Sequence, residues 1–217
     1  MARRIALASA LFFSVVLARY SLPSLSPYLG AVLDTASIGL LISAYWAAYT
    51  AFQLIGGLAV GKFGYRLSAL AGLASSAVLA LYPTALGRVE ALLALQAASG
   101  AFAAVVYVGM ASMAIEGSKG RTGLGAGLYQ SAYFLASSTS LLATPYLYSL
   151  DVVLPFLAYS ALMAVAGAAV FAQGGRPAKR GGGGALNKRI FAVGLARFSA
   201  GFSYLGFLSW SNYFSSA

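Results

Sequence analysis

Two arginines inside long apolar stretches are the side chains most able to bind a ligand. Arg19 lies in the segment LARYS, residues 17–21, and Arg197 lies in LARFS, residues 195–199. A buried arginine in a membrane costs about 2.5–3.5 kcal/mol on insertion scales, so it usually faces a cavity or a partner. The apolar stretches contain no carboxylate to neutralise either one. Because a guanidinium stays charged and presents a planar fork to phosphate or carboxylate oxygens, the pair predicts an anion site.

The same two arginines also have a simpler interpretation. Arg19 is fourteen residues beyond Ile5, whereas Arg197 is seven beyond Ile190. At 1.5 Å per helical residue, they would lie roughly 10 Å apart in depth if both helices begin at the same level. Arg197 would then extend its charge to the membrane boundary. Anion binding by the pair and a structural or boundary role for at least one member both stay open.

Other polar and aromatic residues in the apolar stretches are weaker candidates for a site. Gln96 and Gln130 could line a cavity, although glutamines also hydrogen-bond across packed membrane helices. The aromatic residues are expected to anchor helices at the membrane interface and to pack, rather than to form a ligand cage. They are Tyr45, Trp46, Tyr49, Trp210 and Tyr213.

Seven apolar stretches must position these side chains. Each reaches or nearly reaches the roughly 20 helical residues that cross a bilayer core. They are residues 5–28, 38–60, 67–82, 92–115, 124–147, 152–172 and 190–214. The predicted fold class is therefore all-α, a polytopic membrane bundle of about seven transmembrane helices.

The positive charges fall on alternate sides of these stretches. Eleven of the fourteen cations lie on one side and Arg88 alone lies on the other. The eleven are Arg3, Arg4, Lys62, Arg66, Lys119, Arg121, Arg176, Lys179, Arg180, Lys188 and Arg189. Because cytoplasmic loops carry the excess of Lys and Arg, this predicts a multi-pass plasma-membrane protein with a cytoplasmic N-terminus.

Composition excludes several other functions. Hydrophobic residues make up 60% of the chain and charged residues 8%, against about 25% in a soluble domain. The net charge of +10 would suggest nucleic acid in a soluble protein, but here the cations flank membrane spans, so no nucleic-acid partner is expected. The chain has no cysteine and no histidine. We therefore expect no metal site, no cofactor and no enzymatic activity.

One break in hydrophobicity divides the chain. Residues 173–189, QGGRPAKRGGGGALNKR, are rich in glycine and cations and predict a solvated cytoplasmic linker. It separates a six-helix N-terminal bundle, residues 1–172, from a seventh helix, residues 190–217. Within the bundle, Gly57 with Gly61 and Gly123 with Gly127 have the spacing that allows close helix packing in lipid.

The most specific motif is GGLAVGKFGYRL, residues 56–67. Its first seven residues fit the nucleotide-binding pattern GxxxxGK. However, Phe63 stands where that loop needs Ser or Thr for magnesium, and an apolar helix rather than a strand precedes it. The motif is therefore not a nucleotide-binding loop.

The segment instead resembles the signature of the major facilitator superfamily, G-x-L-a-D-r-x-G-r-r, between helices two and three. Gly57, Lys62, Gly64 and Arg66 match it, and Gly61 replaces the aspartate. In the family that aspartate helps to latch the cytoplasmic side, so the resemblance implies a gating motif that lacks one of its parts.

The resemblance implies an architecture of two six-helix halves around a central path. This chain would supply the first half, the linker and the seventh helix, with five further spans expected after Ala217 in a second half. Arg19 and Arg197 lie on helices that are repeat equivalents in the family. This pair resembles that of the organophosphate and anion exchangers, and implies alternating-access transport of a small organic or inorganic anion.

Other functions stay open at this point. One is a carrier of neutral solutes or drugs whose coupling carboxylates lie in the second half. Another is a seven-helix receptor, although a retinal pump is disfavoured because no lysine lies inside the seventh span. An enzyme within the membrane would need a His, Cys or carboxylate cluster that these spans lack.

Overall fold

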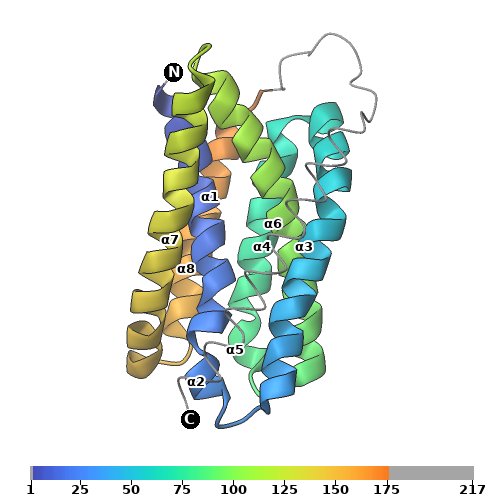
Figure 1. The fold of residues 1–217 in the computed structure, drawn as a ribbon, viewed down its shortest axis with the longest axis vertical. Coiled ribbons are helices and arrows are strands. Elements are labelled where there is room, and N and C mark those ends of the chain that lie inside the picture. Colours follow the sequence, from blue (N-terminus) through green and yellow to red (C-terminus); the bar gives the residue numbers. More distant parts are fainter. Residues whose placement is uncertain (1, 176–217) are drawn as a thin grey trace. The chain divides into compact units, whose positions relative to one another are not determined.

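The computed structural model describes residues 2–175 of the chain, and these form eight helices. The chain divides into two compact units, residues 1–178 and 179–217, and the first unit holds all the described residues. Its long helices run side by side, and the two short helices α2 and α5 lie at the end away from the N-terminus (Figure 1). The bounds are α1 Ala2–Ser24, α2 Ser26–Leu29, α3 Thr35–Phe63, α4 Tyr65–Ala80, α5 Tyr82–Ala85, α6 Val89–Gly117, α7 Thr122–Leu150 and α8 Leu154–Gln173.

The helices begin and end at residues with clear local causes. Before α3, the Asp34 carboxylate accepts hydrogen bonds from the Ser37 backbone N–H at 2.7 Å and from the Ser37 hydroxyl at 3.0 Å. These bonds favour the charged form and hold the pKa of Asp34 below its ordinary value. After α3, Gly64 adopts a φ of +82° and its N–H donates to the Val60 carbonyl, which ends the helix.

The predicted apolar stretches between residues 5 and 172 form long helices, which confirms the all-α fold class. Four of them, α1, α3, α6 and α8, are long and apolar enough to cross a membrane. The stretch 67–82 is interrupted near Pro83, which lacks the N–H that would continue the helical hydrogen bonds. The 16-residue α4 ends at Ala80, and Tyr82 begins the short helix α5. The 29-residue α7 carries many hydroxyl side chains.

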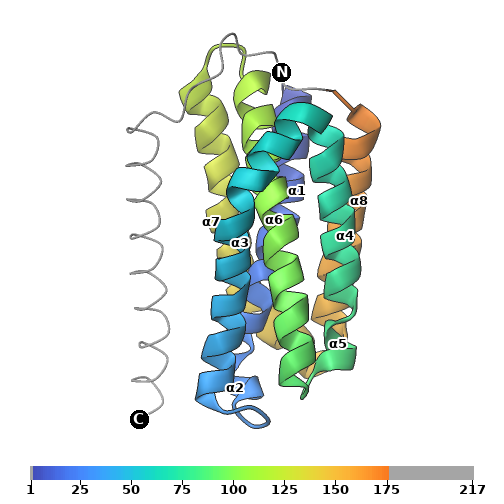
Figure 2. The ribbon, with the colours of Figure 1, turned by 90° about the vertical axis from the view of Figure 1, so that its right-hand side faces the viewer.

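Helix α1 lies in the interior of this unit. It packs against α6, α7 and α8, while α3 packs chiefly against α6, and α4 packs against both α6 and α8 (Figures 1 and 2). The α1 residues Ala8 and Leu11 are fully buried. In contrast, α3 is exposed along much of its length, and α3 and α7 stand at opposite edges of the view in Figure 1.

Glycines of α6 bring the neighbouring helices close. A Cβ placed on Gly100 would overlap the Tyr45 carbonyl oxygen of α3. A Cβ on Gly109 would overlap the Ser68 hydroxyl of α4. Since real Cβ atoms do not approach backbone so closely, glycine at position 100 allows α3 to lie directly against α6.

The glycine pairs predicted from spacing are not the ones that make this contact. A Cβ on Gly61, Gly123 or Gly127 would meet no described atom within 4 Å, and one on Gly57 would make an ordinary contact with Val108. The predicted packing role is therefore wrong for Gly61, Gly123 and Gly127 within the described bundle, whereas Gly57 does face α6. Spacing indicates that two glycines share a helix face, but it does not tell which face meets another helix.

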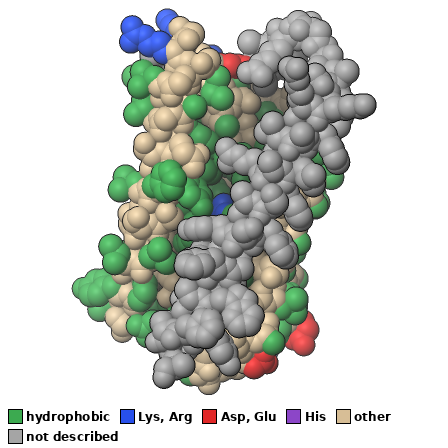
Figure 3. All heavy atoms as spheres, in the orientation of Figure 1, with side chains coloured by type: hydrophobic (Ala, Val, Ile, Leu, Met, Phe, Trp, Pro, Cys, Tyr) green, Lys and Arg blue, Asp and Glu red, His purple; other side chains and the backbone are tan. Residues whose placement is uncertain are grey.

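The surface has charge at its ends and an apolar belt between them. Figure 3 shows Lys and Arg side chains near the N-terminus and acidic side chains at the opposite end. Large hydrophobic side chains remain exposed along the helices, including Leu58 (72%), Leu142 (79%) and Val165 (70%). Such a belt is typical of a bundle whose outer face meets lipid or further helices.

Candidate functional site

Arg19 of α1 lies among five aromatic rings, which we call the aromatic cage. Its guanidinium carbon is 3.5 Å from the ring centroid of Trp46, the distance of a direct stack. The other four rings have their centroids 5.3–5.7 Å from the same carbon. They belong to Tyr20, Tyr45, Tyr49 and Tyr133.

Three helices build the cage. Residues 45, 46 and 49 of α3 lie on one side of that helix, because residues three or four apart are neighbours on a helix surface. The close approach of α3 to α6 at Gly100 fixes the backbone of Tyr45. Tyr133 comes from α7, and its hydroxyl lies 2.5 Å from that of Tyr20 on α1. The cage is thus fixed by packing and by one hydroxyl pair.

The cage compensates the charge of Arg19 without a carboxylate. Among residues 2–175, no acidic side chain pairs with Arg19, and its buried Nε has no hydrogen-bond partner. Cation–π contacts contribute about 2 kcal/mol or more when water is excluded, which offsets much of the cost of burying the charge. Ring faces cannot accept the N–H hydrogen bonds as an oxygen would. The arrangement can therefore accept an anionic oxygen.

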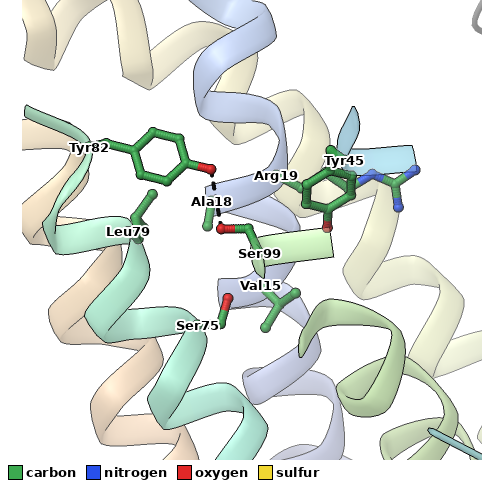
Figure 4. A pocket seen from close by; sticks show the side chains of 8 residues that line it. All are labelled: Val15, Ala18, Arg19, Tyr45, Ser75, Leu79, Tyr82 and Ser99. Carbon is green, nitrogen blue, oxygen red and sulfur yellow. Dashed lines mark hydrogen bonds between the residues drawn. The ribbon is translucent and has the colours of Figure 1, made fainter. Parts of the chain in front are cut away.

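A small cavity lies on the other side of Arg19. Its volume is about 10 Å³, close to the minimum that one water molecule needs. Tyr82 donates a hydrogen bond to the Ser99 hydroxyl across it at 3.2 Å, and the guanidinium points away from it (Figure 4). The lining residues are Val15, Ala18, Arg19, Tyr45, Ser75, Leu79, Tyr82 and Ser99. This cavity is too small for a solute, so the cage side is the candidate site.

The other predicted binding residues do not join the cage. Gln96 is buried in α6 and Gln130 is exposed on α7, one turn before Tyr133. Neither glutamine lines the small cavity. Arg197 lies outside the described residues, so its pairing with Arg19 stays a prediction.

The aromatic residues of α3 were underestimated by sequence reasoning. Tyr45, Trp46 and Tyr49 were expected to anchor the helix at the membrane interface and to pack, and they pack around Arg19. The interface part of that expectation is wrong for these three residues, and the packing part is seen in the contacts among their rings. The usable signal was an aromatic face on one apolar stretch and an unpaired arginine in the middle of another. Trp210 and Tyr213 lie outside the described residues.

The motif residues 57–66 end α3 and begin α4. The cations Lys62 and Arg66 are both exposed. The Lys62 Nζ lies 5.2 Å from the Phe63 ring centroid, and the Arg66 guanidinium carbon lies 5.5 Å from that of Phe171 on α8. Gly61 is exposed as well, so the position that holds aspartate in the family signature is open here.

Tyr65 ties this turn to α6. It is 1% exposed, and its hydroxyl donates a hydrogen bond of 2.6 Å to a carboxylate oxygen of Glu116. Its backbone N–H donates to the Gly175 carbonyl at 3.2 Å. Tyr65 stands where the family signature has the first of two closing cations, so an uncharged hydroxyl rather than a cation binds the carboxylate at this position. Sequence reasoning missed Glu116, because its partner is far away in the chain.

Comparison with known proteins supports the family that the motif and the helices suggest. No curated protein matches the chain. The family model of the Major Facilitator Superfamily matches residues 7–217, which includes the whole of the described bundle beyond the first turn of α1. Together with the apolar helices, this match makes the chain a multi-pass membrane protein. The chain therefore belongs to the Major Facilitator Superfamily, a family of membrane transporters.

Proposed function

We propose that this transporter carries a small anion, organic or inorganic, and that Arg19 pairs with its negative charge. One observation carries the proposal: a guanidinium inside a membrane bundle is stacked on Trp46 and has no carboxylate partner among the described residues. In a membrane such a charge is expensive unless it has a use. An anion would neutralise the charge and accept the N–H bonds that the rings leave unmade.

The proposal includes alternating access. In two-halved transporters of this kind the site lies near the bilayer midplane, and one bundle rocks against the other. Arg19 lies beside Tyr45, Trp46 and Tyr49, which are in the middle part of the 29-residue α3, and this supports a midplane site. We propose that Arg197 supplies a second cation, and that a second six-helix half completes the path as a partner of this bundle.

Ligand-dependent stability tests the anion proposal. The thermal unfolding midpoint of the detergent-solubilised chain would be measured with phosphate, sulfate, acetate and benzoate, against chloride at equal ionic strength. A ligand at 100 times its dissociation constant should add about 2.7 kcal/mol of stability. We expect at least one of the four to stabilise the wild type and not Arg19→Gln.

The matched control is Arg88→Gln. Arg88 is an exposed arginine before α6, so the variant removes the same charge away from the cage. It should keep the whole anion response. Equal stabilisation of Arg19→Gln and wild type would contradict the proposal. No stabilisation of the wild type by any anion would favour the neutral-solute carrier instead.

We further propose that the protein resides in the plasma membrane with its N-terminus in the cytoplasm. The cation asymmetry supports this orientation. Because the chain lacks cysteine, single cysteines at Lys62, Lys119 and Lys179 can be labelled without background. They should react with an impermeant reagent only from the cytoplasmic side. Labelling from outside at any two of them would overturn the orientation.

A further inference from the structure

We infer that the anion at Arg19 carries a flat apolar ring, so that the preferred substrate class is a ring-bearing organic anion such as an aromatic carboxylate. The inference rests on the proposed anion transport and goes further, since a bare inorganic anion would satisfy Arg19 equally well. It is carried by the aromatic surface that continues beyond the cage.

The aromatic rings extend from the cage as a continuous tract. The Tyr49 ring centroid is 6.1 Å from that of Tyr107 on α6, and Tyr107 is 5.6 Å from Phe12 on α1. Phe12 stacks on Tyr129 of α7 at 4.2 Å and lies 6.2 Å from Tyr133. Rings from α1, α3, α6 and α7 therefore form one apolar surface beside the guanidinium.

Some rings of the tract are buried, and others are partly exposed. Phe12 and Tyr129 are 3% and 4% exposed, so they serve as its packed base. Trp46, Tyr107 and Tyr133 are only partly buried, and they come from three different helices. Figure 3 shows a basic side chain at mid-height of the visible face, with hydrophobic side chains on one side of it. A ligand at Arg19 would therefore meet partly exposed ring surface.

Some tyrosine hydroxyls of the cage and the tract are engaged in hydrogen bonds. Those of Tyr20 and Tyr133 lie 2.5 Å apart and share a hydrogen bond, and the Tyr129 hydroxyl donates to the Tyr107 carbonyl at 3.1 Å. At these three residues the tract offers ring carbons to the body of a ligand. A polyhydroxylated body would lose hydrogen bonds to water there, whereas an apolar ring would lose none.

The stack of Trp46 on Arg19 fits the same ligand. A ring over the guanidinium face covers that face and leaves the N–H groups at its edge as the donors. A carboxylate would bind at that edge, and the ring attached to it would extend over the partly exposed aromatic surface. Sulfate or phosphate would bind the N–H edge of the guanidinium and leave the aromatic surface in contact with water.

Tryptophan fluorescence can test this directly. The chain has two tryptophans, so Trp210→Phe leaves Trp46 as the reporter inside the site. The full chain in lipid nanodiscs would be titrated with benzoate, acetate and sulfate. We expect benzoate to bind about tenfold or more tightly than acetate, because ring stacking and ring burial add to the same carboxylate contact.

Ring variants locate the effect in the tract. In the Trp210→Phe background, Tyr133→Leu should lower the benzoate-to-acetate preference severalfold, and Tyr133→Phe should keep it. Tyr146→Leu is the control, because Tyr146 lies on the same helix and is 66% exposed. If Tyr133→Leu does not fold, the benzoate-to-acetate ratio of the Trp210→Phe chain itself still decides, because equal affinities would overturn the inference.

The outcomes separate this inference from the proposed function. Equal affinity for benzoate, acetate and sulfate, all lost in Arg19→Gln, would overturn the ring inference and leave anion binding in place. Binding that Arg19→Gln does not weaken would overturn the anion proposal itself. A benzoate preference that depends on Arg19 and on the ring at position 133 would support both.

Discussion

Two regions of this bundle place cations over aromatic rings, and they do so in different surroundings. At the α3–α4 turn, Lys62 and Arg66 are exposed and each lies beside one ring, at 5.2 and 5.5 Å. In the interior, five rings surround Arg19 and the closest is 3.5 Å away. Exposed cation–π contacts contribute about 0.5–1 kcal/mol, whereas desolvated ones contribute about 2 kcal/mol or more. Water solvates the two cations at the turn, whereas aromatic rings surround the cation of Arg19.

The acidic residues of the described chain sharpen this contrast. Glu116 lies near the turn, where Tyr65 binds it. The other three acidic residues, Asp34, Glu90 and Asp151, are exposed at helix ends. The interior thus has a cation and, among the described residues, no anion, whereas the turn has both. A charge that is left for a ligand and a charge that stabilises a turn should respond differently to mutation.

The largest expected difference comes from one glycine in each region. In Gly100→Val the new side chain would overlap the Tyr45 carbonyl, so we expect a loss of about 3 kcal/mol or more, or no folded protein. Gly61→Val at the turn meets open space and should change stability by less than about 0.5 kcal/mol. Size-exclusion profiles and thermal unfolding would measure both. Equal stability of the two variants would show that α3 does not pack closely against α6 at Gly100.

A smaller effect is expected at the Tyr65–Glu116 bond. Tyr65→Phe removes the hydroxyl and leaves a carboxylate without that donor, so we expect a loss of about 1–2 kcal/mol. Anion binding at Arg19 should not change, because the bond belongs to the turn. Thermal unfolding and the anion titration would both be measured on Tyr65→Phe and on the wild type. A large loss of anion affinity with normal stability would mean that the two regions are coupled.

The sequence predicts the helices well because apolar runs of this length have few alternatives in a membrane. The start of α3 is marked by Asp34 and its end by Gly64. The break between α4 and α5 was missed, although Pro83 marks it. Arg19 was predicted as a site from its charge inside an apolar stretch and from the resemblance of the Arg19 and Arg197 pair to that of the anion exchangers. The cage was not, because the contact of Tyr133 with Arg19 depends on which turn of α7 lies beside α1.

The smallest effect is expected from Asp34, which caps α3 away from both regions. Its hydrogen bonds from Ser37 lower its pKa, so its contribution to stability is present above its ordinary value of 3.8 and is lost as the pH falls through the lower folded value. Asp34→Asn keeps a capping oxygen but does not titrate. Between about pH 6 and pH 3, the wild type should lose slightly more stability than Asp34→Asn. Parallel pH profiles for the two proteins would show that the ionisation of Asp34 does not contribute to stability.

The central claim is that Arg19, held by aromatic rings, is the group that binds the anion. It is tested most directly by comparing Arg19→Lys with Arg66→Lys, since both keep the charge and lose the planar fork. Binding of benzoate and phosphate would be followed by Trp46 fluorescence in the Trp210→Phe chain. Arg19→Lys should weaken the bound anion about ten- to a hundredfold, and Arg66→Lys should leave its affinity unchanged. Unchanged affinity in Arg19→Lys, or an equal loss in both variants, would contradict the claim.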